Sequence, residues 1–305
     1  MSVLQVSLFG SMQIVHHGWS AEMKVTHTVR ALLAYLLLQR HRYHPREVLA
    51  NLFWGEYSET RARSCLSTAL WRLRLVLEPA GISPGTYLMT TPSGEIGFNS
   101  NSDYWLDVAI FEELAGQVLR QPSEGLTLAT VQEFEQVLPL YTGELMEGFY
   151  DDWALRERER LRLLYLNSLI CLMRYYHHHG AYEQSLNYGQ QILKLDPLRE
   201  EIHREIMRLY LENGQRTLAV RQYEICREIL AMELGISPME ETQALYNQIV
   251  PTTSRHRLQA VSIVEPINLQ HGLRQLRLAI RSFDEAREHL QRAIQLVEQF
   301  TERQE

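Results

Sequence analysis

The spacing of hydrophobic residues changes from an alternating to a helical pattern near residue 26. Residues 3–25 hold short apolar runs separated by turn residues, which is typical of short β-strands. From residue 28 to about residue 39, apolar side chains cover one helical face. Thr26 or Thr28 is a suitable N-cap for this helix, because a threonine hydroxyl accepts hydrogen bonds from the backbone N–H groups of a first turn.

Two more helices are predicted before residue 80. The first covers residues 45–54, since a proline at position 45 favours a first turn and Gly55 is a stop signal. The other covers residues 58–78 and is ended by Pro79 and Gly81. Its apolar residues recur three and four positions apart, so one face is suited to burial. These residues are Ala62, Leu66, Ala69, Leu70, Leu73 and Leu77.

A hairpin is predicted after the third helix. Residues 86–98 place strand-forming side chains on both sides of the turn Pro92-Ser93-Gly94. Short strands, three helices and a terminal hairpin, in this order, predict a winged helix-turn-helix of the α+β class. The third helix is then the expected recognition helix.

From about residue 105 onward the pattern is almost entirely helical, and part of it repeats. Three residues recur with their character kept after 34 positions, which is the period of tetratricopeptide repeats. Such helix pairs stack into a solenoid that binds other proteins. The sequence therefore predicts a mainly α protein, in which a tetratricopeptide-like α-helical repeat domain follows the winged helix-turn-helix. The recurring residues are Tyr176, Gly180 and Leu186, then Tyr210, Gly214 and Val220.

Four segments are expected along the chain. Residues 1–101 form the winged helix-turn-helix and residues 102–250 the helical repeat domain. Residues 251–268 are rich in Pro, Thr and Ser without clear periodicity, which predicts a linker. Residues 269–305 form an amphipathic helical extension that would cap the repeat, form a dimer interface or pack on the DNA-binding domain.

Charge is distributed unevenly between these segments. The whole chain has a net charge of −7, which as an average argues weakly against nucleic-acid binding. Residues 1–104 carry nine lysines and arginines against seven aspartates and glutamates, a balance of +2 that leaves −9 for the rest. A slightly basic first third on an acidic body is consistent with a local DNA-binding surface.

The composition is that of a protein of the cytoplasm. The longest uninterrupted apolar run, residues 31–38, is too short to span a membrane. The N-terminus has neither the basic region nor the cleavage site of a signal peptide. Cys65, Cys171 and Cys226 lie far apart, which indicates reduced thiols and no metal site. We therefore expect a cytoplasmic protein with no membrane contact.

The third helix carries the residues best suited to contact double-stranded DNA. An α-helix fits the major groove, where arginine binds guanine and hydroxyl groups bind bases or phosphates. The alternative is an ordinary solvated helix face, although the only acid inside the helix before its last residue, Glu78, is Glu59 at its start. Trp71 is expected to pack or to contact a phosphate. The candidates are Arg46, Arg61, Arg63, Ser64, Ser67, Thr68, Trp71, Arg72 and Arg74, with Thr90, Thr91 and Ser93 on the wing.

No pattern of catalytic or cofactor-binding residues is found. The chain lacks the GxxxxGK[ST] phosphate-binding loop and the HExxH motif. Residues 177–179 are three consecutive histidines, which point about 100° apart on a helix and cannot converge on one ion. We expect no enzyme activity, no cofactor and no metal.

Several motifs of the chain follow the pattern of one regulator family. The N-terminal run resembles the DNA-binding domain of the Streptomyces antibiotic regulatory protein family, a relative of the OmpR-type winged helix. Gly55 stands where that family usually has proline, which affects a turn. Residues 141–166 resemble the family's bacterial transcriptional activator domain. The matching motifs are Arg30-Ala31-Leu32-Leu33, Arg46-Glu47-x-Leu49, Leu52-x-Trp54, Ala69-Leu70-x-Arg72-Leu73-Arg74, Gly143-x-Leu145-x-x-Gly148-Phe149, Asp152-Trp153, Asp196-Pro197-Leu198-Arg199-Glu200 and Glu233-Leu234-Gly235-Ile236-x-Pro238.

The resemblance implies a transcription activator. It implies binding to promoter repeats, contact with RNA polymerase and a homodimer on DNA, none of which spacing or composition indicates. The alternative hypothesis is a protein-interaction scaffold whose winged helix no longer binds DNA. An acidic or occluded third helix would favour the scaffold.

Overall fold

The computed structural model describes residues 4–16, 19–20 and 25–250. The predicted linker at 251–268 and the helical extension at 269–305 lie outside the described residues. The chain divides into two compact units, Met1–Ser237 and Pro238–Glu305.

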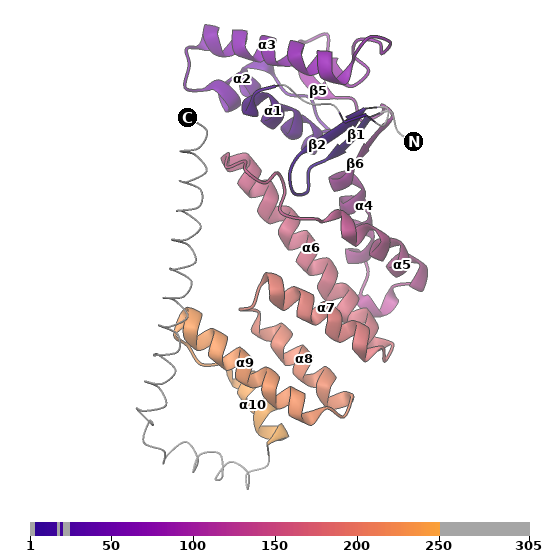
Figure 1. The fold of residues 1–305 in the computed structure, drawn as a ribbon, viewed down its shortest axis with the longest axis vertical. Helices are drawn as coiled ribbons and strands as arrows, with labels where there is room; N and C mark the ends of the chain where they lie inside the picture. Colours follow the sequence, from indigo (N-terminus) through magenta and orange to yellow (C-terminus); the bar gives the residue numbers. More distant parts are fainter. Residues whose placement is uncertain (1–3, 17–18, 21–24, 251–305) are drawn as a thin grey trace, which may run out of the picture. The chain divides into compact units, whose positions relative to one another are not determined.

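A four-stranded sheet begins the first unit, in the order β3-β2-β1-β6 (Figure 1). Strands β1, β2 and β3 are antiparallel neighbours, and β6 pairs in parallel with β1 in a register that places Leu4 opposite Tyr104. The sheet thus takes its last strand from beyond residue 101, where the sequence predicted a domain boundary. The strands are β1 (Leu4–Ser7), β2 (Gln13–His16), β3 (Trp19–Ser20) and β6 (Tyr104–Leu106).

Three helices and a hairpin follow, as the sequence predicts for a winged helix-turn-helix. Eight of the twelve residues of α1 are buried, so this helix is the centre of the N-terminal core. The two other helices bury one face each, and α2 and α3 pack against one another. The elements are α1 (His27–Leu38), α2 (Arg46–Trp54), α3 (Glu59–Leu77), β4 (Leu88–Thr90) and β5 (Ile96–Phe98).

The hairpin of β4 and β5, which we call the wing, is held at both of its strands. The Glu78 carboxylate, just after α3, accepts hydrogen bonds from the backbone N–H groups of Gly85, Tyr87 and Leu88 at 2.8–3.0 Å. On the other strand, His44 and Ile96 exchange two backbone hydrogen bonds of 2.8 Å. Because the wing is held on both sides, its position relative to α3 is defined by the fold.

Asp107 joins the N-terminal sheet to the helices that follow. It starts α4, and its buried carboxylate accepts hydrogen bonds from the backbone N–H groups of Leu8 and Phe9 at 2.8–3.0 Å. Burial raises the pKa of this carboxyl, and its backbone hydrogen bonds oppose the shift. Nearby, the Arg158 guanidinium donates to the carbonyl oxygens of Leu145, Met146 and Phe149, each at 2.9 Å. The segment that Arg158 holds is itself joined to the N-terminal sheet, because the backbone N–H of Met146 donates to the Leu8 carbonyl oxygen and that of Gly10 to the Glu144 carbonyl oxygen, both at 2.8 Å. The winged helix is therefore fastened to the helical part through backbone groups of both.

The rest of the first unit is helical and contains two consecutive helix pairs (Figure 1). Helix α6 packs against α7, and α8 against α9. Gly180 and Gly214 each follow the first helix of a pair and have φ angles of 68° and 71°, a backbone conformation that favours glycine. The helices are α4 (Asp107–Leu119), α5 (Leu128–Val137), α6 (Asp152–His178), α7 (Tyr182–Leu195), α8 (Glu200–Glu212) and α9 (Arg216–Leu234), with the 3-10 turns η1 (Ser123–Gly125) and η2 (Leu138–Leu140).

The second unit contributes one described helix, α10 (Glu240–Ile249). The mainly α architecture predicted from the sequence is confirmed, with a small β/α domain at the N-terminus and helix pairs after it. The histidine tract lies at the end of α6, where His177 Nε2 is 2.7 Å from a carboxylate oxygen of Glu212.

Candidate nucleic-acid interface

Helix α3 presents a broad exposed face opposite its buried one. Its buried residues are the six apolar positions that the spacing predicts. Successive residues of an α-helix are rotated by about 100°, which puts Ser64 and Trp71 at the middle of the exposed face. The Trp71 side chain is 59% exposed. The two flanks of this face differ in how their side chains are engaged.

The flank toward α2 and the wing is tied to its neighbours by hydrogen bonds. Arg46 of α2 donates to the Ser67 hydroxyl at 2.9 Å, and that hydroxyl donates to the Arg63 carbonyl oxygen at 2.9 Å. Farther along α3, Arg74 donates to the Thr90 hydroxyl of the wing at 2.9 Å. These bonds fix the spacing between the recognition helix and the elements beside it, and they leave most of the guanidinium N–H groups open to another acceptor.

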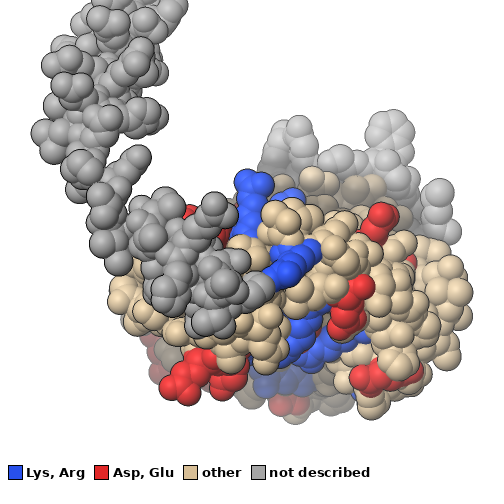
Figure 2. All heavy atoms as spheres, turned by 90° about the horizontal axis from the view of Figure 1, so that it is seen from below, with Lys and Arg blue, Asp and Glu red and all other residues tan. Residues whose placement is uncertain are grey.

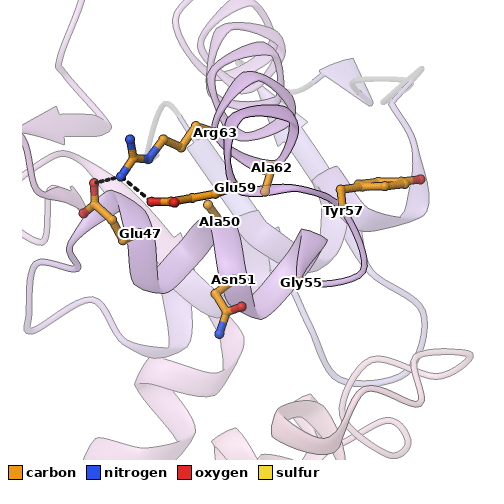
Figure 3. Close-up of a pocket in the computed structure, with 8 residues that line it drawn as sticks. All are labelled: Glu47, Ala50, Asn51, Gly55, Tyr57, Glu59, Ala62 and Arg63. Carbon is orange, nitrogen blue, oxygen red and sulfur yellow. Dashed lines mark hydrogen bonds and ion pairs between the residues drawn. The ribbon is translucent and has the colours of Figure 1, made fainter.

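Arg63, on the same flank, lies between two carboxylates (Figure 3). Its Nη2 is 2.7 Å from Glu59 Oε1, one turn earlier on α3, and 3.6 Å from Glu47 Oε1 on α2. The three side chains line a pocket of about 150 Å³ between the two helices. Its other lining residues are Ala50, Asn51, Gly55, Tyr57 and Ala62.

The opposite flank is less engaged. The Arg61 guanidinium lies 4.5 Å from the centre of the Tyr57 ring, a cation–π contact. Thr68 donates to the Ser64 carbonyl oxygen at 3.0 Å. Arg72 is exposed, and within residues 4–16, 19–20 and 25–250 it makes no hydrogen bond or ion pair through its side chain. Arg72 is therefore the α3 arginine most available to a ligand.

The tip of the wing is organised by its own side chains. The hydroxyls of Thr91 and Ser93 are 2.8 Å apart, and Thr91 accepts from the backbone N–H of Glu95 at 3.0 Å. Ser93 in turn donates to the Glu95 carboxylate at 3.1 Å. The turn is thereby preordered, and Ser93 and Thr90 remain exposed at its surface.

The structure adds three residues that the sequence reading did not include. Leu75, 55% exposed, follows Trp71 by one turn on the same face, and an apolar side chain there can contact a thymine methyl group. The i, i+4 spacing from Trp71 was a signal that could have identified it. Tyr57 contacts Arg61 and Glu47 contacts Arg63, so both residues affect the arginines of this surface. These contacts depend on how the elements pack, which the sequence alone does not indicate.

The candidate interface is locally basic. Five arginines, from α2 and α3, stand against the two glutamates Glu47 and Glu59 on this surface. By contrast, the face seen in Figure 2, which is viewed from below relative to Figure 1, intersperses basic side chains with acidic ones. A positive surface on an acidic chain is the charge distribution that a local nucleic-acid contact requires.

His44 lies behind the wing, with its side chain buried. It is 4% exposed, its ring centre is 5.1 Å from that of Tyr35, and its Nε2 has no hydrogen-bond partner within the described residues. Burial lowers the pKa of His44 below its ordinary value of 6.5, Arg42 lowers it further, and Glu95 opposes both. The fold therefore favours the neutral imidazole.

Acidification is expected to destabilise the protein through this histidine. The unfolded chain binds a proton at His44 more readily than the folded chain, so the contribution is present above pH 6.5 and is lost as the pH falls below it. Urea unfolding at about pH 7.5 and about pH 5.5 measures the loss. His44→Phe keeps an aromatic ring beside Tyr35 and should lose less stability between the two pH values; an equal loss would contradict the expectation.

In the part of the chain that the structure describes, no three histidine, cysteine, aspartate or glutamate side chains gather as a metal site would require. None of the helices described there is both long enough and apolar enough to cross a membrane.

Together, the sheet, three helices and wing define a winged-helix protein, joined here to a helical repeat domain. Residues 106–250 match the bacterial transcriptional activator domain. The solved structure of Mycobacterium tuberculosis EmbR in complex with a low affinity phosphopeptide has the same fold, with a TM-score of 0.62 over 86% of this chain and 70% of that one at 20% identity.

Curated relatives extend the similarity into the winged helix. The regulatory protein AfsR of Streptomyces coelicolor is 27% identical over 221 residues, which are 72% of this chain but only 22% of AfsR. The transcriptional regulatory protein MoaR1 of Mycobacterium tuberculosis is 24% identical over 259 residues, 81% of this chain and 79% of MoaR1. The matched domain and these relatives make the chain similar to transcriptional regulators of the Streptomyces antibiotic regulatory protein family.

Proposed function

We propose that the chain is a sequence-specific DNA-binding transcription activator that places α3 in the major groove and the wing beside it. The observation that carries this proposal is the exposed face of α3, where arginines and hydroxyl groups surround Trp71. Arginine binds guanine edges through two parallel hydrogen bonds, and guanidinium groups neutralise phosphates. The buried face of α3 keeps the helix fixed to the domain during both contacts.

The roles of the residues follow from how they are engaged. Arg72 and Arg61 are proposed to read bases or bind phosphates, with Ser64 and Trp71 between them. Arg46 and Arg74 are proposed to bind the backbone while they hold α2 and the wing in place, since their bonds to hydroxyl groups leave other N–H groups open. The remaining proposed contacts come from Arg63, Ser67, Thr68, Thr90, Thr91 and Ser93.

The helical part is proposed to act on the transcription machinery. We propose a DNA-binding domain at residues 1–101 and an activator domain at residues 102–250 that contacts RNA polymerase in the cytoplasm, with a homodimer on promoter repeats. The family supports RNA polymerase as partner. The scaffold hypothesis is less well supported, because an acidic or occluded α3 would favour it and this face is basic and exposed.

Removal of the Arg72 guanidinium is expected to weaken specific DNA binding. Arg72→Ala should lower the affinity for a promoter-type direct repeat by about 1–3 kcal/mol if the side chain reads a base. If it binds a phosphate, the loss is similar for all sequences and the slope of log affinity against log salt falls by about one. Fluorescence anisotropy over a salt series measures both quantities.

The matched control is Arg227→Ala, which removes the same charge from the exposed surface of α9. This variant should bind the repeat with an affinity close to that of the wild type. An equal loss in the two variants would mean that only the total charge matters, and the absence of salt-dependent DNA binding in the wild type would exclude the proposed function.

A further inference from the structure

The position of Arg63 differs from that of the other arginines on α3. Arg61 contacts an aromatic ring and Arg74 a hydroxyl group, whereas Arg63 lies against the carboxylates of Glu59 and Glu47. Figure 3 shows its guanidinium between the two acids, one from each helix. The charge of Arg63 is therefore already compensated within the protein, and the group of three carries a net charge of −1.

This arrangement opposes a phosphate at the N-terminal half of α3. A phosphate that approaches the guanidinium of Arg63 also approaches two carboxylates, which repel it, and the nearer one, on Glu59, already accepts a 2.7 Å hydrogen bond from Arg63 Nη2. All three side chains are more than half exposed, so the guanidinium can reorient without disturbing the core. Exposed ion pairs of this kind contribute little to stability, so their main effect here is on what Arg63 can bind.

We infer that Glu47 and Glu59 act as a charge clamp on Arg63. The clamp lowers the affinity for DNA of non-specific sequence, and it makes the Arg63 guanidinium available to DNA only when the other α3 contacts have formed. The inference rests on the proposed function, because it concerns the same helix. It assigns to the two glutamates a role in specificity, by competition with the DNA backbone for one guanidinium group.

If the two glutamates had a purely structural role, their replacement would have a different effect on DNA affinity. Both lie in the first turn of a helix, where a negative charge stabilises the helix dipole. If that were their whole role, replacing them with glutamine would lower stability and would alter DNA affinity to the same extent whether or not Arg63 is present.

The test is a double-mutant cycle on the full chain. Glu47→Gln/Glu59→Gln is measured with Arg63 and with Arg63→Gln, using a random-sequence duplex and a direct-repeat duplex over a salt series. The clamp predicts that the glutamine pair raises affinity for the random duplex by about three- to fivefold and steepens the salt slope by about one. In the Arg63→Gln background, both gains should be lost apart from the general effect of removing acids.

Glu56→Gln measures that general effect, because Glu56 is an exposed acid in the turn between α2 and α3 that has no ion pair within the described residues. Two results would overturn the clamp while the proposed function stands. One is a gain in affinity for the random duplex that persists in the Arg63→Gln background. The other is a gain that, per removed charge, is no larger than the gain in Glu56→Gln. Urea unfolding shows whether the variants are folded. If folded variants showed no salt-dependent binding to either duplex, the proposed function would be overturned instead.

Discussion

Replacing Trp153 with alanine is expected to lower the free energy of unfolding by about 3–5 kcal/mol. Trp153 lies in the first turn of α6, yet its ring packs edge-on against Tyr35 of α1 and Phe53 of α2, with ring centres 5.3 and 6.1 Å apart. It is 6% exposed. Its loss would leave a cavity where the winged helix meets the activator domain, and urea unfolding measures the cost.

Trp71 provides the matched control. It is a tryptophan of the same size on the exposed face of α3, so Trp71→Ala should change stability by less than about 0.5 kcal/mol. We expect this variant to lose DNA affinity instead. If Trp71→Ala destabilised the protein as much as Trp153→Ala, the assignment of Trp71 to an exposed binding face would be wrong.

Asp107→Asn is the second substitution expected to have a large effect, with a loss of about 3 kcal/mol or more in the free energy of unfolding. The buried carboxylate accepts three backbone N–H groups, from Leu8, Phe9 and Val108. An asparagine has one acceptor oxygen, and its amide N–H₂ would face donors that it cannot satisfy. The substitution thus leaves buried donors unpaired at the join between sheet and α4.

The control for Asp107 is four residues away. Asp103 is exposed, so Asp103→Asn removes the same charge from the surface, and its stability should stay within about 0.5 kcal/mol of the wild type. Denaturant unfolding of both variants compares them directly. Similar stabilities for the two would show that the Asp107 hydrogen bonds do not hold the junction.

Much of the fold could be predicted because, in the helices, the local sequence signals and the tertiary packing favour the same structure. The third helix was expected over residues 58–78 and runs over Glu59–Leu77, since its apolar spacing defines the buried face and Pro79 prevents continuation. The two glycines 34 residues apart also occupy equivalent positions after α6 and α8. Periodicity is a strong signal when a helix has several turns.

Strand β6 shows where sequence reasoning fails. It has three residues, too few for an alternating pattern, and it is a strand because it pairs with β1, about 100 positions earlier in the chain. The carboxylate of Asp107 then holds that pairing in place. A contact so distant in sequence has no local signature, and for this reason the strand could not be found from the pattern of residues 102–106.

The candidate site was predictable in part for the same reasons. Helical spacing alone indicates that Ser64, Trp71 and Arg72 face outward, and they are exposed. The engagement of Arg63 with Glu47 depends on how closely α2 approaches α3, which the spacing within one helix cannot indicate.

The measurement that most directly tests the central proposal is genome-wide mapping of the DNA bound in cells by the wild type and by an Arg61→Ala/Arg72→Ala variant. The proposed function predicts that the wild type is enriched at a discrete set of promoters that share a direct repeat, and that the variant, at equal abundance, loses this enrichment. A wild-type map without enriched promoters, or one that the variant reproduces, would contradict the assignment of α3 as the helix that reads DNA.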